Sequence, residues 1–136
     1  MTTTARFWRE IPSRYNMIGS KCGNCGREFF PPRPLCPECH RKSLGKMQRH
    51  QFSGKGEIVS FSIVHQPPRE FQVEVPYVVA IVELAKGVRV TGQVVECVPG
   101  DVKIGMKVTP VFRRMHQDGK EGAIHYGYKF APAVEK

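Results

Sequence analysis

Five cysteines are the residues of this sequence best suited to chemistry, and four of them form two closely spaced pairs. Cys22 and Cys25 make one Cys-x-x-Cys motif, and Cys36 and Cys39 make a second after ten intervening residues. Two such motifs offer four sulfur ligands at the spacing that a tetrahedral metal ion requires. Zinc is the usual occupant, and iron stays an alternative because tetrahedral sulfur ligands suit both metals.

Other uses of these four cysteines fit less well. Disulfides form in oxidising compartments, but the chain begins with Met1 and three threonines and shows no apolar signal run. A dithiol redox centre needs only one motif, whereas two neighbouring motifs favour shared coordination. With every thiol on the metal, the site is expected to be closed and structural, holding together a ribbon too small to fold unaided.

The residues beside the cysteines suit tight turns. Gly23 and Gly26 allow the chain to turn sharply next to the first motif, because glycine accepts positive φ without steric cost. Pro37 pre-sets the second turn, while His40 stands where a glycine is expected. The gap of ten residues is short for paired motifs, which indicates a compact, rubredoxin-like ribbon.

Charge is unevenly distributed along the 136 residues, whose formal net charge is +9. Residues 1–50 hold ten Lys and Arg against three Glu, a net of +7, and residues 51–136 hold eleven against nine acidic residues, a net of +2. A basic front half favours partners that carry phosphate, or an acidic protein surface. No apolar run approaches the roughly 18 residues of a membrane span, so we expect a soluble, cytoplasmic protein that does not enter membranes.

A short helix is expected at the N-terminus, capped by Thr4 and ended or kinked by Pro12. Its apolar residues recur at four-residue spacing: Phe7, Ile11 and Tyr15. Trp8, the single tryptophan, lies beside them. Two interpretations stay open: the aromatic residues anchor a protein partner, or they cover this chain's own core.

The ribbon itself is predicted from strands on either side of the first motif. Residues 15–21 lead into that motif, and residues 28–30 return from it. Three prolines between positions 31 and 34 remove backbone donors, so this stretch is expected to be a loop packed on the ribbon. Arg27 and Arg33 are candidates for contacts with phosphate, or are simply solvated.

After His50 the sequence changes to strand-length apolar runs separated by turns. Five strands are predicted: 58–64, 77–84, 88–95, 107–115 and 124–130. Five short strands without a long helix favour a closed OB-type barrel, because closure removes exposed strand edges. Glycines at positions 54, 56, 92 and 127 are expected at sharp bends, Pro110 at an edge or bulge, and residues 98–105 in a turn.

The predicted fold class is therefore mainly β. A short N-terminal helical segment (residues 1–14) precedes a zinc ribbon (residues 15–50) and a five-stranded OB-fold domain (residues 51–136). The long, proline-containing connection at residues 66–76 is a candidate contact loop on the binding face of the barrel, or an ordinary surface loop without a ligand.

Several motifs along nearly the whole chain resemble a family of acyl-CoA-associated proteins that join an N-terminal helix, a rubredoxin-like zinc ribbon and an OB fold. The motifs are Phe7-Trp8, Cys22-x-x-Cys25, Phe30-Pro31-Pro32-Arg33, Cys36-Pro37-x-Cys39, Gly54-x-Gly56, Pro76-Tyr77 and Ile104-Gly105-Met106-x-Val108. Two further segments, Tyr15-Asn16-Met17-Ile18-Gly19 and Tyr126-Gly127-Tyr128-Lys129-Phe130, are similar to the archaeal members of the family. His40 departs from the glycine more usual in the second motif.

The resemblance implies a scaffold without catalytic residues, bound to acetoacetyl-CoA thiolase and hydroxymethylglutaryl-CoA synthase in isoprenoid precursor synthesis. It implies structural Zn²⁺ on Cys22, Cys25, Cys36 and Cys39, and CoA as a ligand shared with the enzymes. Basic residues of the ribbon would meet the phosphates of CoA, and the barrel its pantetheine arm. A scaffold of this kind raises the local concentration of an intermediate whose formation is uphill.

Two other classes of function are weighed against the scaffold. Single-stranded nucleic-acid binding would suit a zinc ribbon and an OB barrel with a pI near 9.6, using aromatic residues interleaved with basic ones. The candidate rings are Phe61, Tyr77, Phe112, Tyr126 and Tyr128. The small net charge of the barrel half weakens this reading.

An enzyme would need a nucleophile outside the metal site. Cys97 is the one cysteine beyond the two motifs, and a base for it would come from His65, His116 or His125. A small buried thiol at the end of a strand is the simpler reading of Cys97. The sequence therefore predicts no catalytic residue.

Overall fold

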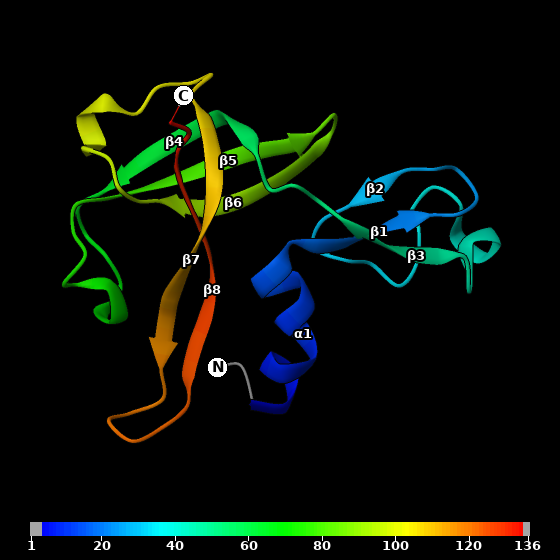
Figure 1. The fold of residues 1–136 in the computed structure, drawn as a ribbon, viewed down its shortest axis with the longest axis horizontal. Helices are drawn as coiled ribbons and strands as arrows, with labels where there is room; N and C mark the ends of the chain where they lie inside the picture. The colour runs from blue at the N-terminus through cyan, green and yellow to red at the C-terminus, as the bar shows by residue number, and fades with distance from the viewer. Residues whose placement is uncertain (1–3, 135–136) are drawn as a thin grey trace. The chain divides into compact units, whose positions relative to one another are not determined.

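The computed structural model describes residues 4–134 and is mainly β, with one α-helix and three short 3₁₀ helices in that part of the chain (Figure 1). The elements are, in order, α1 (Thr4–Asn16), β1 (Ile18–Cys22), β2 (Glu28–Phe29), η1 (His40–Ser43), β3 (Met47–Gln51), β4 (Gly56–Val64), η2 (Arg69–Phe71), β5 (Tyr77–Ala85), β6 (Val88–Val94), η3 (Pro99–Asp101), β7 (Lys107–Gln117) and β8 (Ile124–Pro132). Among these residues no helix is both long and apolar enough to cross a membrane.

The described chain divides into two compact units. The first contains residues 4–53 together with Phe112–Tyr128, and the second contains Gly54–Val111 together with residues 129–134. The first unit therefore holds helix α1, the ribbon strands and the part of the β7–β8 hairpin from Phe112 to Tyr128. The second unit holds most of the barrel.

Helix α1 is longer than predicted. Thr4, predicted to cap the helix, is itself helical, and the helix continues through Pro12 to Asn16. The turn after Pro12 is held by packing, because the ring of Tyr15 lies 6.2 Å from that of Phe7 and 5.0 Å from that of Phe112. Such contacts offset the hydrogen bond that proline cannot donate. Tyr15 is therefore in the last turn of the helix instead of opening the first strand, and the strand begins at Ile18.

The ribbon is a three-stranded antiparallel sheet in the order β2-β1-β3. The strands on either side of the first motif were predicted, but β3 was not. Its sequence, Met-Gln-Arg-His-Gln, has no apolar alternation, and it is a strand because it pairs along all of β1, from Ile18 with Gln51 to Cys22 with Met47. Gly19 is needed at this sheet, because a Cβ there would lie 2.3 Å from the carbonyl oxygen of Phe29.

The five predicted barrel strands are confirmed, and their hydrogen bonds close a barrel in the order β4-β5-β6-β8-β7. Antiparallel pairing is extensive between β4 and β5 and between β5 and β6, with a bulge between Ile58 and Ser60. The pairing of β4 with β7 is short, and β6 meets β8 in parallel at Val94 and Phe130. The short 3₁₀ helix η3 occupies the predicted turn between β6 and β7.

The barrel core consists of fully buried β-branched side chains around one phenylalanine. Ile58, Val82, Val108 and Phe130 have no exposed surface. Gly92 of β6 makes room for the aromatic ring, because a Cβ on Gly92 would lie 2.6 Å from a ring carbon of Phe130. Glycine is needed at this position because the strand passes close to a core ring, and not because the backbone has an unusual φ angle.

Candidate metal centre and other candidate sites

The four paired cysteines meet at one end of the ribbon. Cys22 ends β1, Cys25 lies in the following turn, and Cys36 and Cys39 lie in the turn before η1. Their sulfur atoms all lie within 4.8 Å of one another, and those of Cys25 and Cys36 are 3.6 Å apart. A zinc ion with four Zn–S bonds of about 2.3 Å separates its sulfurs by about 3.8 Å. The arrangement fits a tetrahedral ion.

The two motifs have matching backbone frames. The N–H of Gly26 donates to the carbonyl of Cys22 at 2.9 Å, and the N–H of His40 donates to the carbonyl of Cys36 at 2.9 Å. The residue after the last cysteine of each motif has a left-handed backbone, with φ of +74° at Gly26 and +47° at His40. His40 therefore occupies a conformation that favours glycine. Gly23 has a different role, since a Cβ there would lie 2.7 Å from the carbonyl oxygen of Lys46.

A buried serine supports the second motif and was not predicted from the sequence. The hydroxyl of Ser43 accepts a hydrogen bond from the N–H of Cys36 at 3.0 Å and donates one to the carbonyl of His40 at 2.7 Å. Ser43 has no exposed surface, and Cys36 has none either. In the first motif, the side-chain amide of Asn24 donates to the sulfur of Cys39 at 3.1 Å. The Ser43 hydrogen bonds hold the backbone of the second motif in place, and the Asn24 hydrogen bond stabilises negative charge on the sulfur of Cys39.

The sulfur cluster cannot carry four negative charges unaided. The backbone N–H of Cys25 stabilises the thiolate of Cys22 and lowers its pKa to about 7. The backbone N–H of Arg27 also favours the thiolate of Cys25, but burial and the other three thiols together raise the pKa of Cys25 to about 12. A divalent cation removes this repulsion and deprotonates coordinating thiols. The chemistry of the donor set therefore matches a zinc ribbon, and the relatedness described below supports structural zinc.

Cys97 lacks the surroundings of a nucleophile. Burial, followed by the negative charge of Asp101, raises the pKa of the Cys97 thiol, so it stays protonated near neutral pH. Of the proposed bases, His116 and His125 point their Nε2 atoms at the carboxylate of Asp118, at 3.1 Å and 2.8 Å, and belong to the first unit. Cys97 belongs to the second unit.

The two arginines considered for phosphate contacts are engaged within the ribbon. Arg27 forms an ion pair with Glu38 at 2.7 Å. The guanidinium of Arg33 lies 5.5 Å from the centre of the Phe29 ring, and its backbone N–H donates to Ser20 at 2.9 Å. The guanidinium of Arg27 is therefore already paired with a carboxylate, which weakens its case as a phosphate contact, whereas that of Arg33 is in contact only with a ring.

Most of the aromatic candidates for stacking on nucleic-acid bases are in contact with other rings of the chain. Phe112 stacks on Tyr126 with ring centres 5.2 Å apart. Tyr77 packs against Phe71, and Tyr128 packs against Phe30. Stacking covers one ring face each of Phe112 and Tyr126, and packing against neighbouring rings restrains Tyr77 and Tyr128, which weakens the nucleic-acid reading.

The candidate contact loop is tied to the barrel by a group that the sequence did not indicate. Glu74 accepts hydrogen bonds from the side chains of Gln93 at 2.8 Å and Lys129 at 3.2 Å. Lys129 is buried, and burial would raise the pKa of Glu74, but the two donors outweigh it and the pKa is lowered. The adjacent Val73 is 98% exposed. The loop is thus held in place with an apolar side chain in solvent.

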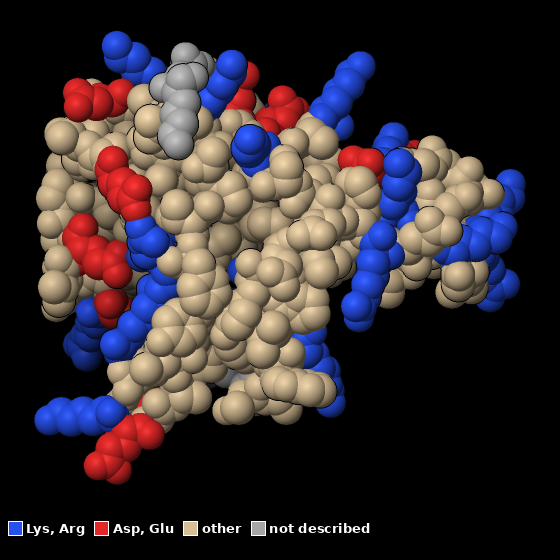
Figure 2. Space-filling model, in the orientation of Figure 1, with Lys and Arg blue, Asp and Glu red and all other residues tan. Residues whose placement is uncertain are grey.

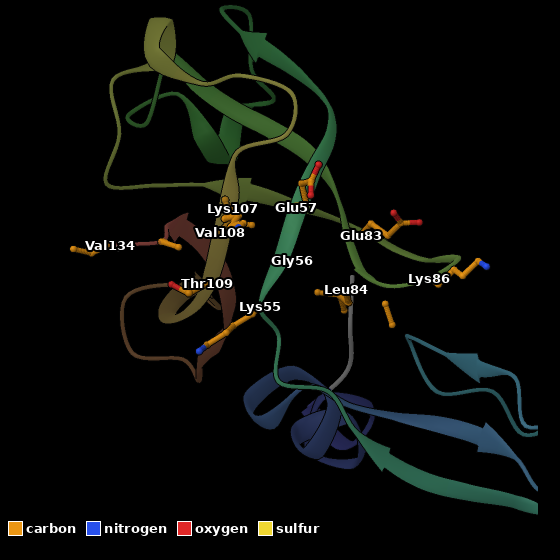
Figure 3. A pocket seen from close by; sticks show the side chains of 12 residues that line it. Lys55, Gly56, Glu57, Glu83, Leu84, Lys86, Lys107, Val108, Thr109 and Val134 are labelled. Carbon is orange, nitrogen blue, oxygen red and sulfur yellow. The ribbon is translucent and has the colours of Figure 1, made fainter. Parts of the chain in front are cut away.

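A pocket of about 510 Å³ opens in the barrel unit, beside the first residues of β4 and β7 and the last residues of β5 (Figure 3). Leu84, Ala85 and Val134 contribute apolar surface to it. Figure 3 shows Lys55 and Lys86 extending to opposite sides of this pocket. These two lysine side chains therefore do not converge on one point of the pocket.

A sulfur-clustered ribbon followed by a closed five-stranded barrel defines a zinc-ribbon and OB-fold protein. Comparisons with family models agree. Residues 9–45 match the ChsH2 rubredoxin-like zinc ribbon domain, and residues 49–113 match the ChsH2 C-terminal OB-fold domain.

Relatives cover almost the full length. A DUF35 domain-containing scaffold protein of Methanothermobacter thermautotrophicus is 54% identical over 97% of this chain and 98% of the relative. A scaffold protein of the same description from Methanocaldococcus jannaschii is 50% identical over 93% of this chain and 89% of the relative. The chain therefore belongs to the family of DUF35 domain-containing scaffold proteins.

A solved structure described as an Ltp2-ChsH2(DUF35) aldolase has the same arrangement of elements. It superimposes with a TM-score of 0.72 at 30% identity and covers 94% of this chain and 93% of that chain. The description joins a DUF35 protein to an enzyme, whereas the two methanogen relatives are described by a scaffold role and not by a reaction.

Proposed function

We propose that this protein is a non-catalytic scaffold that binds acetoacetyl-CoA thiolase and hydroxymethylglutaryl-CoA synthase together in isoprenoid precursor synthesis. The observation that carries the proposal is similarity along 97% of the chain to a scaffold protein. The motifs shared with archaeal members, such as Tyr126 to Phe130, support the choice of these two enzymes.

Proximity gives such a scaffold its effect. Condensation of two acetyl-CoA molecules is uphill, so acetoacetyl-CoA stays scarce unless the next enzyme removes it. Holding the synthase beside the thiolase raises the effective concentration of the intermediate without any new chemistry. A protonated Cys97, with His116 and His125 committed to Asp118, fits a subunit that positions enzymes instead of reacting.

We further propose that Cys22, Cys25, Cys36 and Cys39 hold one structural Zn²⁺. The mutual approach of their sulfurs within 4.8 Å supports this, as does the buried support from Ser43. Elemental analysis is expected to find one zinc per chain. A red protein with one iron per chain would assign the site to iron instead.

CoA is proposed as the ligand shared with the enzymes, with its pantetheine arm in the barrel pocket. The apolar strip of Leu84, Ala85 and Val134 suits an extended arm. Methyl NMR of the assembled complex is expected to show CoA-dependent shifts at Leu84 and Val134. Unchanged methyl signals at saturating CoA would remove CoA from this chain.

A coupled assay tests the scaffold role. Thiolase and synthase are mixed at submicromolar concentration with acetyl-CoA, with and without this chain, and product formation is followed over time. Faster product formation with the chain, together with no turnover by the chain alone, is the expected result. Equal rates in both mixtures, or turnover by the isolated chain, would contradict the proposal.

A further inference from the structure

Helix α1 has one face that is packed and one that is not. Phe7 is buried, and its ring meets that of His125 edge-on with centres 4.3 Å apart. Tyr15 meets the ring of Phe112 in the same way at 5.0 Å. These contacts, all within the first unit, fix the helix on the β7–β8 hairpin and determine which side faces solvent.

The solvent side carries the single tryptophan of the chain. Trp8 is 71% exposed, although tryptophan is among the largest apolar side chains and gains most from burial. The sequence left open whether Phe7 and Trp8 serve the core or a partner, and the structure separates them. Phe7 serves the core, and Trp8 is an aromatic side chain presented on a fixed helix, as interface anchors are.

The charges next to Trp8 are positive. Helix α1 contains three arginines and one acid, Glu10, which already pairs with Arg6 at 3.0 Å and Arg14 at 2.5 Å. Arg9 is exposed and forms no ion pair with any residue in the described part of the chain. The exposed face thus combines an indole with an unneutralised guanidinium.

The same imbalance extends over the ribbon. Glu28 pairs with Lys21 at 3.3 Å and lies 3.4 Å from His50, and Glu38 pairs with Arg27. Among the described residues of the ribbon, the exposed basic side chains that form no ion pair include Arg33, Arg41, Lys42, Lys46 and Arg49. Figure 2 shows Lys and Arg gathered over the ribbon on the visible face. A unit with this field attracts an acidic partner.

We propose that the Trp8–Arg9 face of helix α1 is the docking surface for one of the two enzymes, at a site with an apolar pocket and an acidic rim. The indole of Trp8 fills the pocket, and Arg9 pairs with a carboxylate at its edge. The inference rests on the proposed scaffold function and names the surface that performs half of it. Membership of a family of scaffold proteins favours a protein over nucleic acid as the partner.

Because Trp8 is the only tryptophan, it can be observed alone. The chain is labelled with 5-fluorotryptophan, and its single fluorine-19 signal is followed as unlabelled thiolase or synthase is added. The expected result is a shifted or broadened signal with one enzyme and a sharp, unshifted signal with the other.

Binding measurements with variants complete the test. Trp8→Ala is expected to weaken binding to the responding enzyme at least tenfold. Arg9→Glu is expected to weaken binding to the same enzyme, and to weaken it more at low salt than at high salt, because salt screens exposed charges. Ile104→Ala removes an apolar side chain of similar exposure, 69%, in the other unit and is the matched control that keeps wild-type affinity. Unchanged thermal melting confirms that each variant folds.

The outcomes separate the two proposals. If the wild-type chain binds neither enzyme, the scaffold proposal and the docking surface both fail. If it binds but Trp8→Ala binds equally well and the fluorine signal does not move, the docking surface alone is wrong. A fluorine shift produced by a single-stranded oligonucleotide and by neither enzyme would assign the face to nucleic acid and overturn the proposal.

Discussion

Replacing Cys36 with serine removes one sulfur from the proposed zinc site while changing the shape of the side chain little. The thiol is fully buried, with 0% of the residue exposed, so no solvent ligand reaches the position easily. A serine hydroxyl does not ionise near neutral pH and is a poor zinc ligand. The affinity of the Cys36→Ser protein for zinc is therefore expected to be far below that of the wild type.

The size of the effect follows from how little apolar surface the ribbon buries. Its large buried apolar side chains are Met17, Phe30 and Phe52. Full burial of such side chains contributes about 1.5 to 3 kcal/mol each, so together they contribute about 5 to 9 kcal/mol. Structural zinc contributes on the order of 10 kcal/mol to folding in small zinc domains. Losing the metal removes at least half of these favourable terms, and the ribbon is expected to unfold.

Hydrogen–deuterium exchange measured by mass spectrometry resolves this segment by segment. Protection is expected to disappear from β1 to β3 and to persist in β4 to β6, which lie in the other unit. Cys97→Ser is the matched control, since it removes a thiol outside the cluster and should leave protection and zinc content unchanged. A zinc-free Cys36→Ser protein with wild-type protection in β1 and β3 would refute the reasoning.

Three further predictions concern single residues. His40→Gly is expected to raise the free energy of unfolding of the zinc-loaded chain by about 0.5 to 1 kcal/mol, because glycine adopts a φ of +47° without strain. Gly92→Ala is expected to lower the free energy of unfolding by about 1 to 3 kcal/mol, because the new Cβ would overlap the buried ring of Phe130. The hydrogen bond from His125 lowers the pKa of Asp118 below its unfolded value near 3.8. The stability from this carboxylate is therefore complete above that value and is lost as pH falls through the lower folded pKa, so Asp118→Asn should flatten the acid limb of the stability curve.

One measurement serves the first two of these predictions, and one control variant serves Gly92→Ala. Denaturant unfolding followed by circular dichroism measures the two glycine effects. Gly100→Ala should be close to neutral, because nothing lies within 4 Å of its Cβ position. A Gly92→Ala protein as stable as Gly100→Ala would show that the Phe130 contact is not tight. A lower free energy of unfolding in His40→Gly than in the wild type would contradict the prediction for His40. An acid limb that is identical in the wild type and in Asp118→Asn would contradict the prediction for Asp118.

Local signals in the sequence were enough to find the sulfur cluster and the barrel strands. The cysteine spacing is a local constraint, and alternation of polar and apolar residues, as in Ser60-Phe61-Ser62-Ile63, indicates a strand with one buried face. The sequence also marked position 40 as a place where glycine is expected, and His40 there has a left-handed backbone.

Features that depend on distant residues were missed. The polar strand β3 exists because β1 pairs with it, and helix α1 passes Pro12 because Tyr15 packs on Phe112. The buried supports were also missed, since neither Ser43 under Cys36 nor Lys129 bound to Glu74 carries a sequence signal. Long-range pairing decides each of these cases, and a single sequence does not display it.

Native mass spectrometry of purified thiolase, synthase and this chain tests the central claim most directly. A species containing all three proteins is expected in the full mixture, and no thiolase–synthase species is expected when the chain is left out. If the chain stays apart from both enzymes, or if the two enzymes associate equally well without it, it does not bridge them.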